Sequence, residues 1–186
     1  SIEKPSFNGQ SYINTHLNAW AAYVAQRLSD SGVAGVNEAT LAQWRSAMIT
    51  GLIREAQMAE SRGYTFSSFE TLALARLVLG TGDEWMADAS VSAAVRTWLS
   101  MNNLVAHADS CSDLCKAATA LTLLKADAAS AQAAAILQPI ISRLRVQGRT
   151  GYISAGHDGH ATDMAANSLF LSAAASAMGR QQLAGF

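Results

Sequence analysis

The sequence predicts an all-α protein, an antiparallel α-hairpin array or bundle of about seven helices. Two features of composition favour helices: alanine, the best helix former, supplies about a fifth of the residues, and proline occurs only twice. The third feature is the recurrence of apolar residues every three or four positions. Half of the 186 residues are apolar and 15% are charged, as in folded globular proteins. We expect a single domain over 1–186, with an entry arm at 1–10 and a tail at 180–186.

The first two helices are expected at 11–28 and at about 37–62. Asn37 is a suitable N-cap for the second, and Gly63 suits its C-terminal end. In both helices the apolar residues recur at helical spacing, so we expect them to face the core: Tyr12, Leu17, Trp20, Val24 and Leu28 in the first, and Leu41, Trp44, Met48, Leu52 and Met58 in the second. Glu55 is assigned to the solvent side of the second helix, with Gln43 and Arg54.

Two segments are more apolar than the rest and are expected to form the centre of the fold. The third helix begins at the capping box Ser67–Glu70 and ends at Gly80, and it is apolar nearly all round. The last helix is expected over 161–178, ending at Gly179. We expect residues 71–79 and 164–178 to lie side by side, with the other helices around them.

Three further helices are expected between these two. The first begins at Glu84 or Asp88 and ends near Ser100; the others span about 110–126 and 129–146. Pro139 is expected to kink the last of them, or to break it near Gln138, because proline removes a backbone donor. In the first, the residues expected to pack inward are Val91, Val95, Trp98 and Leu99.

One sequence pattern occurs twice in the chain. Gly63-Tyr64 and Gly151-Tyr152 each follow a long helix and precede a polar segment and an apolar helix. Short connections make successive helices antiparallel neighbours, so the repeated pattern indicates two related α-hairpins. This hairpin rhythm resembles that of α/α-toroids, such as the thioester domain of α2-macroglobulins and the polysaccharide lyases. The Gly-Cys-Gly-Glu-Gln-type signature of the former is absent, and no family is assigned.

Cys111 and Cys115 are the only cysteines. Four residues apart on a helix, their Cα atoms are expected about 6 Å apart, within the reach of a disulfide. A bridge here would clamp the start of the fifth helix and indicate an oxidising compartment, periplasmic or extracellular. The alternatives are two unrelated thiols in a cytoplasmic protein, a redox-active pair, and a zinc site that would need His107 and a fourth ligand.

Charge and motifs exclude several function classes. The net charge is −1 and the basic residues are scattered, which argues against nucleic-acid binding. No apolar run is long enough for a membrane span. The sequence has no glycine-rich phosphate loop, nucleophile elbow or HExxH motif, and this argues against the commoner enzymes.

The glycine-rich segment 148–160 and the start of the last helix are the best candidate site, because a loop of this length is unusual in an otherwise tight chain. Its two imidazoles, His157 and His160, could hold a divalent metal together with Asp163. A histidine and an aspartate could instead act as general acid and base, with Tyr152 as a proton donor. The alternative is a solvated loop that caps the last helix. The candidate binding residues are therefore Tyr152, His157, Asp158, His160 and Asp163. His16 is expected to be a packing residue.

The leading functional hypothesis is a non-catalytic protein-interaction module outside the cytoplasm, of the inhibitor, immunity or envelope-assembly type. It needs no cofactor, and its partner is another protein or a second copy of the chain. One alternative is a metal-dependent or acid–base enzyme that uses the 157–160 loop. Another is a small-molecule binder with an apolar pocket between the third and last helices.

Overall fold

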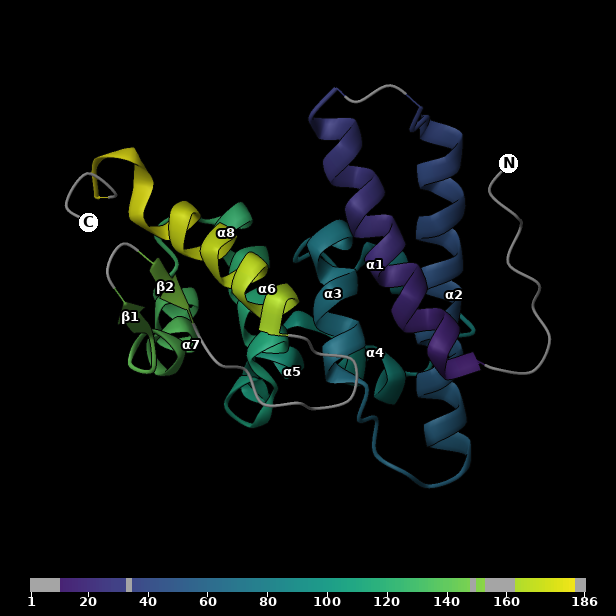
Figure 1. Ribbon diagram of the computed structural model, residues 1–186. Helices are drawn as coiled ribbons and strands as arrows, with labels where there is room; N and C mark the ends of the chain where they lie inside the picture. Colours follow the sequence, from purple (N-terminus) through teal and green to yellow (C-terminus); the bar gives the residue numbers. More distant parts are fainter. Residues whose placement is uncertain (1–10, 33–34, 148–149, 153–162, 183–186) are drawn as a thin grey trace.

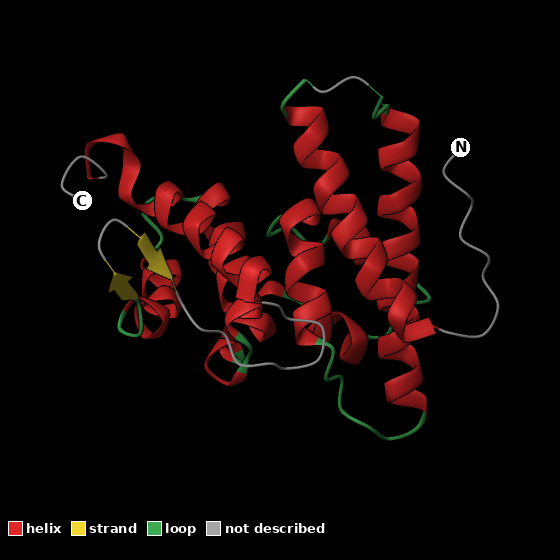
Figure 2. Cartoon of the chain, viewed as in Figure 1, coloured by secondary structure: helices red, strands yellow, loops and turns green. Residues whose placement is uncertain are grey.

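The computed structural model of the chain describes residues 11–32, 35–147, 150–152 and 163–182. This part of the protein is almost entirely helical, which confirms the all-α prediction (Figure 2). Short 3-10 turns lie at Glu84–Met86 and Ala108–Ser110, and two short strands pair antiparallel near the C-terminal end of the chain. The elements are α1 (Ser11–Asp30), α2 (Glu38–Ser61), α3 (Phe69–Leu79), α4 (Ala93–Leu99), α5 (Met101–Ala106), α6 (Asp113–Ala126), α7 (Ala131–Ile141), β1 (Arg145–Gln147), β2 (Thr150–Tyr152) and α8 (Asp163–Gln182).

The helices form an open row. In Figure 1, α1 and α2 stand at one side, α7 and α8 at the other, and α3 and α6 between them. Helix α1 packs on both α2 and α3, α3 packs on α6, and α6 contacts both α7 and α8. The buried apolar side chains of the described residues form one core that runs from α1 to α8. Because α2 and α7 lie at opposite ends of this row, the described helices do not close into a ring.

The central helix is α6, which the sequence analysis did not single out. Every residue from Ala117 to Leu124 is buried. It lies between α3 and α8, so the expected side-by-side packing of α3 with the last helix is wrong. Helix α3 is buried along its length as expected. Helix α8 lies at the edge and leaves Met164 82% and Leu171 59% exposed.

Helix α1 is rotated from the expected orientation, although Trp20 packs against the core as expected. Thr15, Ala19 and Ala22 face the core, whereas Leu17, Val24 and Leu28 are exposed. The reason is close packing on α2. At Gly51, a Cβ atom would come within 2.5 Å of Thr15 Oγ1. Only small side chains fit where two helix backbones approach this closely, so the bulkier apolar stripe points outward.

The starts of α2 and α3 differ in how far they match the sequence. Asn37 caps α2 as expected, with its Oδ1 accepting a 2.8 Å bond from the Thr40 amide. The capping box expected at α3 does not form: the Ser68 side chain makes no cap hydrogen bond to the helix. Glu70, the expected partner of Ser67, instead accepts a 2.5 Å bond from Ser112 Oγ at the start of α6. The long-range contact replaces the local one.

The fourth expected helix is two helices, α4 and α5, separated by Ser100. This residue has extended backbone angles (φ −67°, ψ 152°) and caps α5 by accepting a bond from the Asn103 amide. A serine that caps a new helix ends the previous one. Val91, Val95 and Leu99 are buried as expected, and Trp98 is half-buried.

The helix expected over 129–146 ends earlier than predicted, at Ile141. Pro139 lies inside α7, two residues before its end. Residues 145–147 then form β1, which pairs antiparallel with β2, Arg145 opposite Tyr152 and Gln147 opposite Thr150. Helix α8 also differs from the prediction, because it continues through Gly179 to Gln182. One glycine lowers helix propensity by only about 1 kcal/mol, too little to end a helix of this length.

Cys111 and Cys115 form the expected disulfide, with an S–S distance of 2.04 Å and a Cα–Cα distance of 5.7 Å. The bridge joins Cys111, two residues before α6, to the first turn of the helix, which Ser112 caps by accepting a bond from the Cys115 amide. Cys115 is fully buried. The bridge therefore anchors the start of the central helix.

Candidate functional site

The segment that the sequence favoured as a site lies mostly outside the described residues. His157, Asp158 and His160 belong to it, and Asp163 is the first residue of α8, with a side chain that is not described. Tyr152 is described: it ends β2 and is 43% exposed. The metal and acid–base hypotheses for this loop remain predictions. Among the described residues, no group of three or more His, Cys, Asp or Glu side chains is placed to hold a metal ion.

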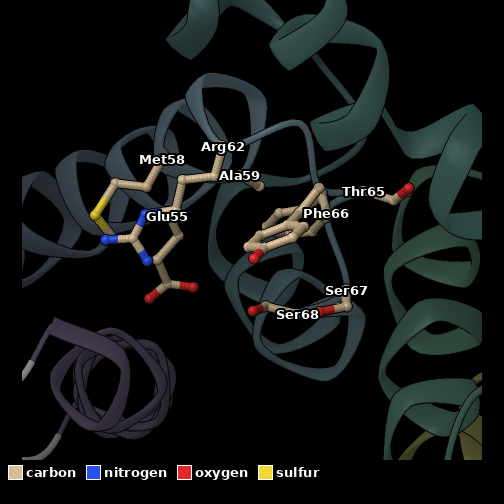
Figure 3. A pocket seen from close by; sticks show the side chains of 9 residues that line it. Glu55, Met58, Ala59, Arg62, Thr65, Phe66, Ser67 and Ser68 are labelled. Carbon is tan, nitrogen blue, oxygen red and sulfur yellow. The ribbon is translucent and has the colours of Figure 1, made fainter.

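A different polar site lies at the end of α2. A hollow of about 150 Å³ opens between the last turns of α2 and the segment that leads to α3 (Figure 3). Its rim is exposed at Arg62, Tyr64 and Ser67. Its lining is both polar and apolar: Glu55, Met58, Ala59, Arg62, Tyr64, Thr65, Phe66, Ser67 and Ser68.

Glu55 is the chemically distinctive residue of this hollow. Only 3% of it is exposed, although the sequence analysis assigned it to solvent. Burial raises the pKa of its carboxyl above the ordinary value, while hydrogen bonds with Thr15 and Ser68 lower that pKa and only partly compensate. Its Oε1 atom has no hydrogen-bond partner among the residues the structure describes. No ion pair neutralises Glu55 within that part of the chain.

Other buried polar side chains near the start of α3 hold helices together. His16 Nδ1 lies 3.0 Å from Thr71 Oγ1, which joins α1 to α3. His16 Nε2 is also 4.0 Å from Glu70 Oε1, whose other oxygen accepts the bond from Ser112. These groups are enclosed by α1, α3 and α6, with His16 only 5% exposed. A substrate cannot reach the imidazole, which therefore joins helices, in line with the packing role expected from the sequence.

Arg76 is a second buried charge with a structural role. Its guanidinium donates to the carbonyls of Gly82 at 2.6 Å and Leu99 at 2.5 Å, and to Asp83 Oδ1 at 2.6 Å. It also lies 5.1 Å from the centre of the Trp85 ring. Burial lowers the pKa of Arg76, and the paired Asp83 opposes that effect. Arg76 thus connects α3 to the 80–85 turn and to the end of α4.

The outward face of α1 is the most distinctive apolar surface of the described chain. Leu17, Val24 and Leu28 are 56%, 48% and 38% exposed, and the partly buried Ala21 lies between them. We call these four residues the α1 stripe. Their spacing of four, three and four residues is that of the a and d positions of a coiled coil. Such a narrow seam is typical of a helix that packs along one other helix.

Sequence reasoning missed Glu55 and Arg76, although signals for both were present. Glu55 is seven residues after Met48 and three after Leu52, so helical spacing places it on the apolar side of α2. Arg76 is the only charge in the apolar run 71–79. A charged residue inside an apolar pattern is buried only when it has partners or a function.

Comparisons with known proteins give no further guide to function. No family model, curated protein or solved structure matches the chain. None of the described helices is long and apolar enough to cross a membrane. Two surfaces of the described chain are candidates for binding: the hollow beside Glu55 and the α1 stripe.

Proposed function

We propose that the protein is a non-catalytic, helical protein-interaction module that acts through the α1 stripe. The observation that carries this proposal is the orientation of α1, which exposes Leu17, Val24 and Leu28 while small and polar residues face the core. Because about half of each side chain is exposed, this orientation forgoes roughly 1 kcal/mol of burial for each. A partner that covers the stripe would recover this free energy.

The partner that the stripe fits is the same stripe of a second copy, packed antiparallel. Around a two-fold axis between residues 22 and 23, Leu17 would face Leu28 of the second copy, and Ala21 would face its Val24. The α1 stripe can therefore pack against an identical stripe, as the isologous interface of a two-fold symmetric dimer requires. One exposed basic residue, Arg27, and one acidic residue, Asp30, lie at the end of the helix, so α1 lacks the basic face that binds anionic membranes.

The Cys111–Cys115 bridge supports a place outside the cytoplasm, periplasmic or extracellular. Disulfides persist in oxidising compartments and are rare where cytosolic thiol reductants act. A bridged pair at the start of the central helix fits a protein that folds under oxidising conditions.

Sedimentation velocity of the purified protein tests the proposal. Between about 10 μM and 1 mM we expect a reversible monomer–dimer equilibrium, weak because one helix pair is a small interface. Leu17→Glu is expected to abolish the dimer, since it places a carboxylate in the apolar seam. Leu171→Glu is the matched control, because Leu171 is similarly exposed but lies on α8. A wild-type protein that stays monomeric at 1 mM, or a dimer equally sensitive to both substitutions, would overturn the proposal.

A further inference from the structure

The hollow at the end of α2 has the size and form of a small-ligand site. Its volume of about 150 Å³ is comparable to cavities that hold a benzene-sized molecule. Its floor contains the buried carboxyl of Glu55, and its rim is exposed. Figure 3 shows the Ser67, Ser68 and Phe66 side chains grouped across the hollow from α2. The hollow opens to solvent at its rim, and Glu55 belongs to its lining, so a ligand that enters the hollow lies beside this residue.

The groups around Glu55 are those that bind an ammonium ion. A carboxylate supplies the counter-charge, and the hydroxyl of Ser68, on the same side of the hollow in Figure 3, can accept a hydrogen bond. Tyr64 and Phe66 add aromatic rings, whose faces attract cations. The open acceptor capacity of Glu55 Oε1 leaves room for one more donor. A buried carboxyl with an open acceptor is costly in an empty protein and is satisfied by a cationic donor.

The mouth of the hollow carries the opposite charge. Arg62, which is exposed, also lines the hollow, and its backbone lies two helical turns after Glu55 at the end of α2. No ion pair forms between Arg62 and Glu55 among the contacts of the described residues. The guanidinium is a strong partner for a carboxylate. A negative floor and a positive rim form a complementary pair of charges for a molecule with both.

We propose that this hollow binds a small zwitterion, an amino-acid-sized molecule whose ammonium group contacts Glu55 and whose carboxylate contacts Arg62. The site is separate from the α1 stripe, so the two proposals stand or fall independently. A molecule with only a positive charge would make the Glu55 contact alone, and one with only a negative charge would meet a carboxylate at the floor.

Titration by NMR of the full-length protein tests this with three probes: γ-aminobutanoate, n-butylamine and butanoate. We expect saturable shifts at residues 55–68 with γ-aminobutanoate, weaker binding of n-butylamine and no saturable binding of butanoate. Glu55→Gln should weaken γ-aminobutanoate binding about tenfold or more, because a charged hydrogen bond is lost. Arg62→Gln should reduce the affinity for γ-aminobutanoate to that for n-butylamine.

Glu60→Gln and Arg54→Gln are the matched controls. Both residues are exposed on α2 and neither lines the hollow, so both variants should bind like the wild type. If Glu55→Gln fails to fold, Ala59→Phe serves instead, since it fills the hollow from its wall and should also abolish binding. The proposal is overturned if wild-type protein shows no saturable binding at about 10 mM probe, or if neither Glu55→Gln nor Ala59→Phe weakens it.

Discussion

Helices α1 and α6 are both rich in alanine but have opposite relations to the core. Helix α6 is surrounded by α3, α7 and α8 and is buried along most of its length. Helix α1 contacts α2 and α3 on one side and leaves Leu17, Val24 and Leu28 exposed to solvent. The difference shows that the closeness of neighbouring backbones decides which face of a helix is buried, and hydrophobicity alone does not.

The largest expected difference between the two helices is the cost of removing one leucine side chain. Leu114→Ala in α6, at a fully buried position, should lower the free energy of unfolding by about 2–5 kcal/mol, because it leaves a cavity. Leu17→Ala in α1 should change it by less than about 0.5 kcal/mol in the dilute monomer. Urea unfolding at low protein concentration measures both. Equal losses would mean that α1 buries its apolar stripe in the monomer.

A smaller effect is expected from the bridge that anchors α6. Replacing both Cys111 and Cys115 by alanine should lower the free energy of unfolding by about 2 kcal/mol, because the loop that the bridge closes is short. Thermal unfolding of the variant, and of wild-type protein with and without reductant, measures this. A thiol count of the untreated protein should find neither sulfur reactive. Two reactive thiols would contradict both the bridge and the proposed compartment.

The smallest effect concerns Glu55, whose carboxyl meets the inner face of α1 at Thr15. Its pKa is raised in the folded state by burial, so folding favours the protonated form. Protonation of Glu55 therefore stabilises the folded protein. This contribution is fully present below the unfolded-state pKa of Glu55 and is lost as pH rises through its folded-state pKa.

Glu55→Gln should remove this part of the pH dependence, since an amide does not titrate. Unfolding free energies of both proteins between about pH 4 and 8 measure it, with Glu60→Gln as the exposed control. A Glu55→Gln protein whose stability falls with pH as steeply as that of the wild type would show that Glu55 is not the group responsible.

Much of the fold followed from local sequence signals. The Asn37 cap, the long α2, the buried α3 and the cysteine pair all depend on residues within a few positions of one another. Local signals also misled in two places. Ser67 and Glu70 have the spacing of a capping box, but the helix is N-capped at Ser68 and Glu70 bonds Ser112 from α6. Ser100 looked like a helix end but separates two helices.

The candidate sites depended on tertiary structure more than the helices did. The Glu55 hollow unites the end of α2 with the 64–68 segment, and its hydrogen bond with Thr15 depends on how α1 crosses α2. Helical spacing alone could have placed Glu55 on the buried side of its helix. The hollow beside it could not be foreseen, because it depends on where the connecting segment packs.

Residue propensities and spacings along single helices were enough to predict that the chain is helical and roughly where most helices lie. They were also enough to predict that Cys111 and Cys115 can be bridged. Tertiary structure alone decided that α6 is central, that α8 lies at the edge and that α1 turns its leucines outward. Helical periodicity defines the faces of a helix, but a face is buried only if its side chains fit the distance to the next backbone. Between α1 and α2 that distance is set at Gly51 of α2, where an added Cβ atom would clash with Thr15 of α1.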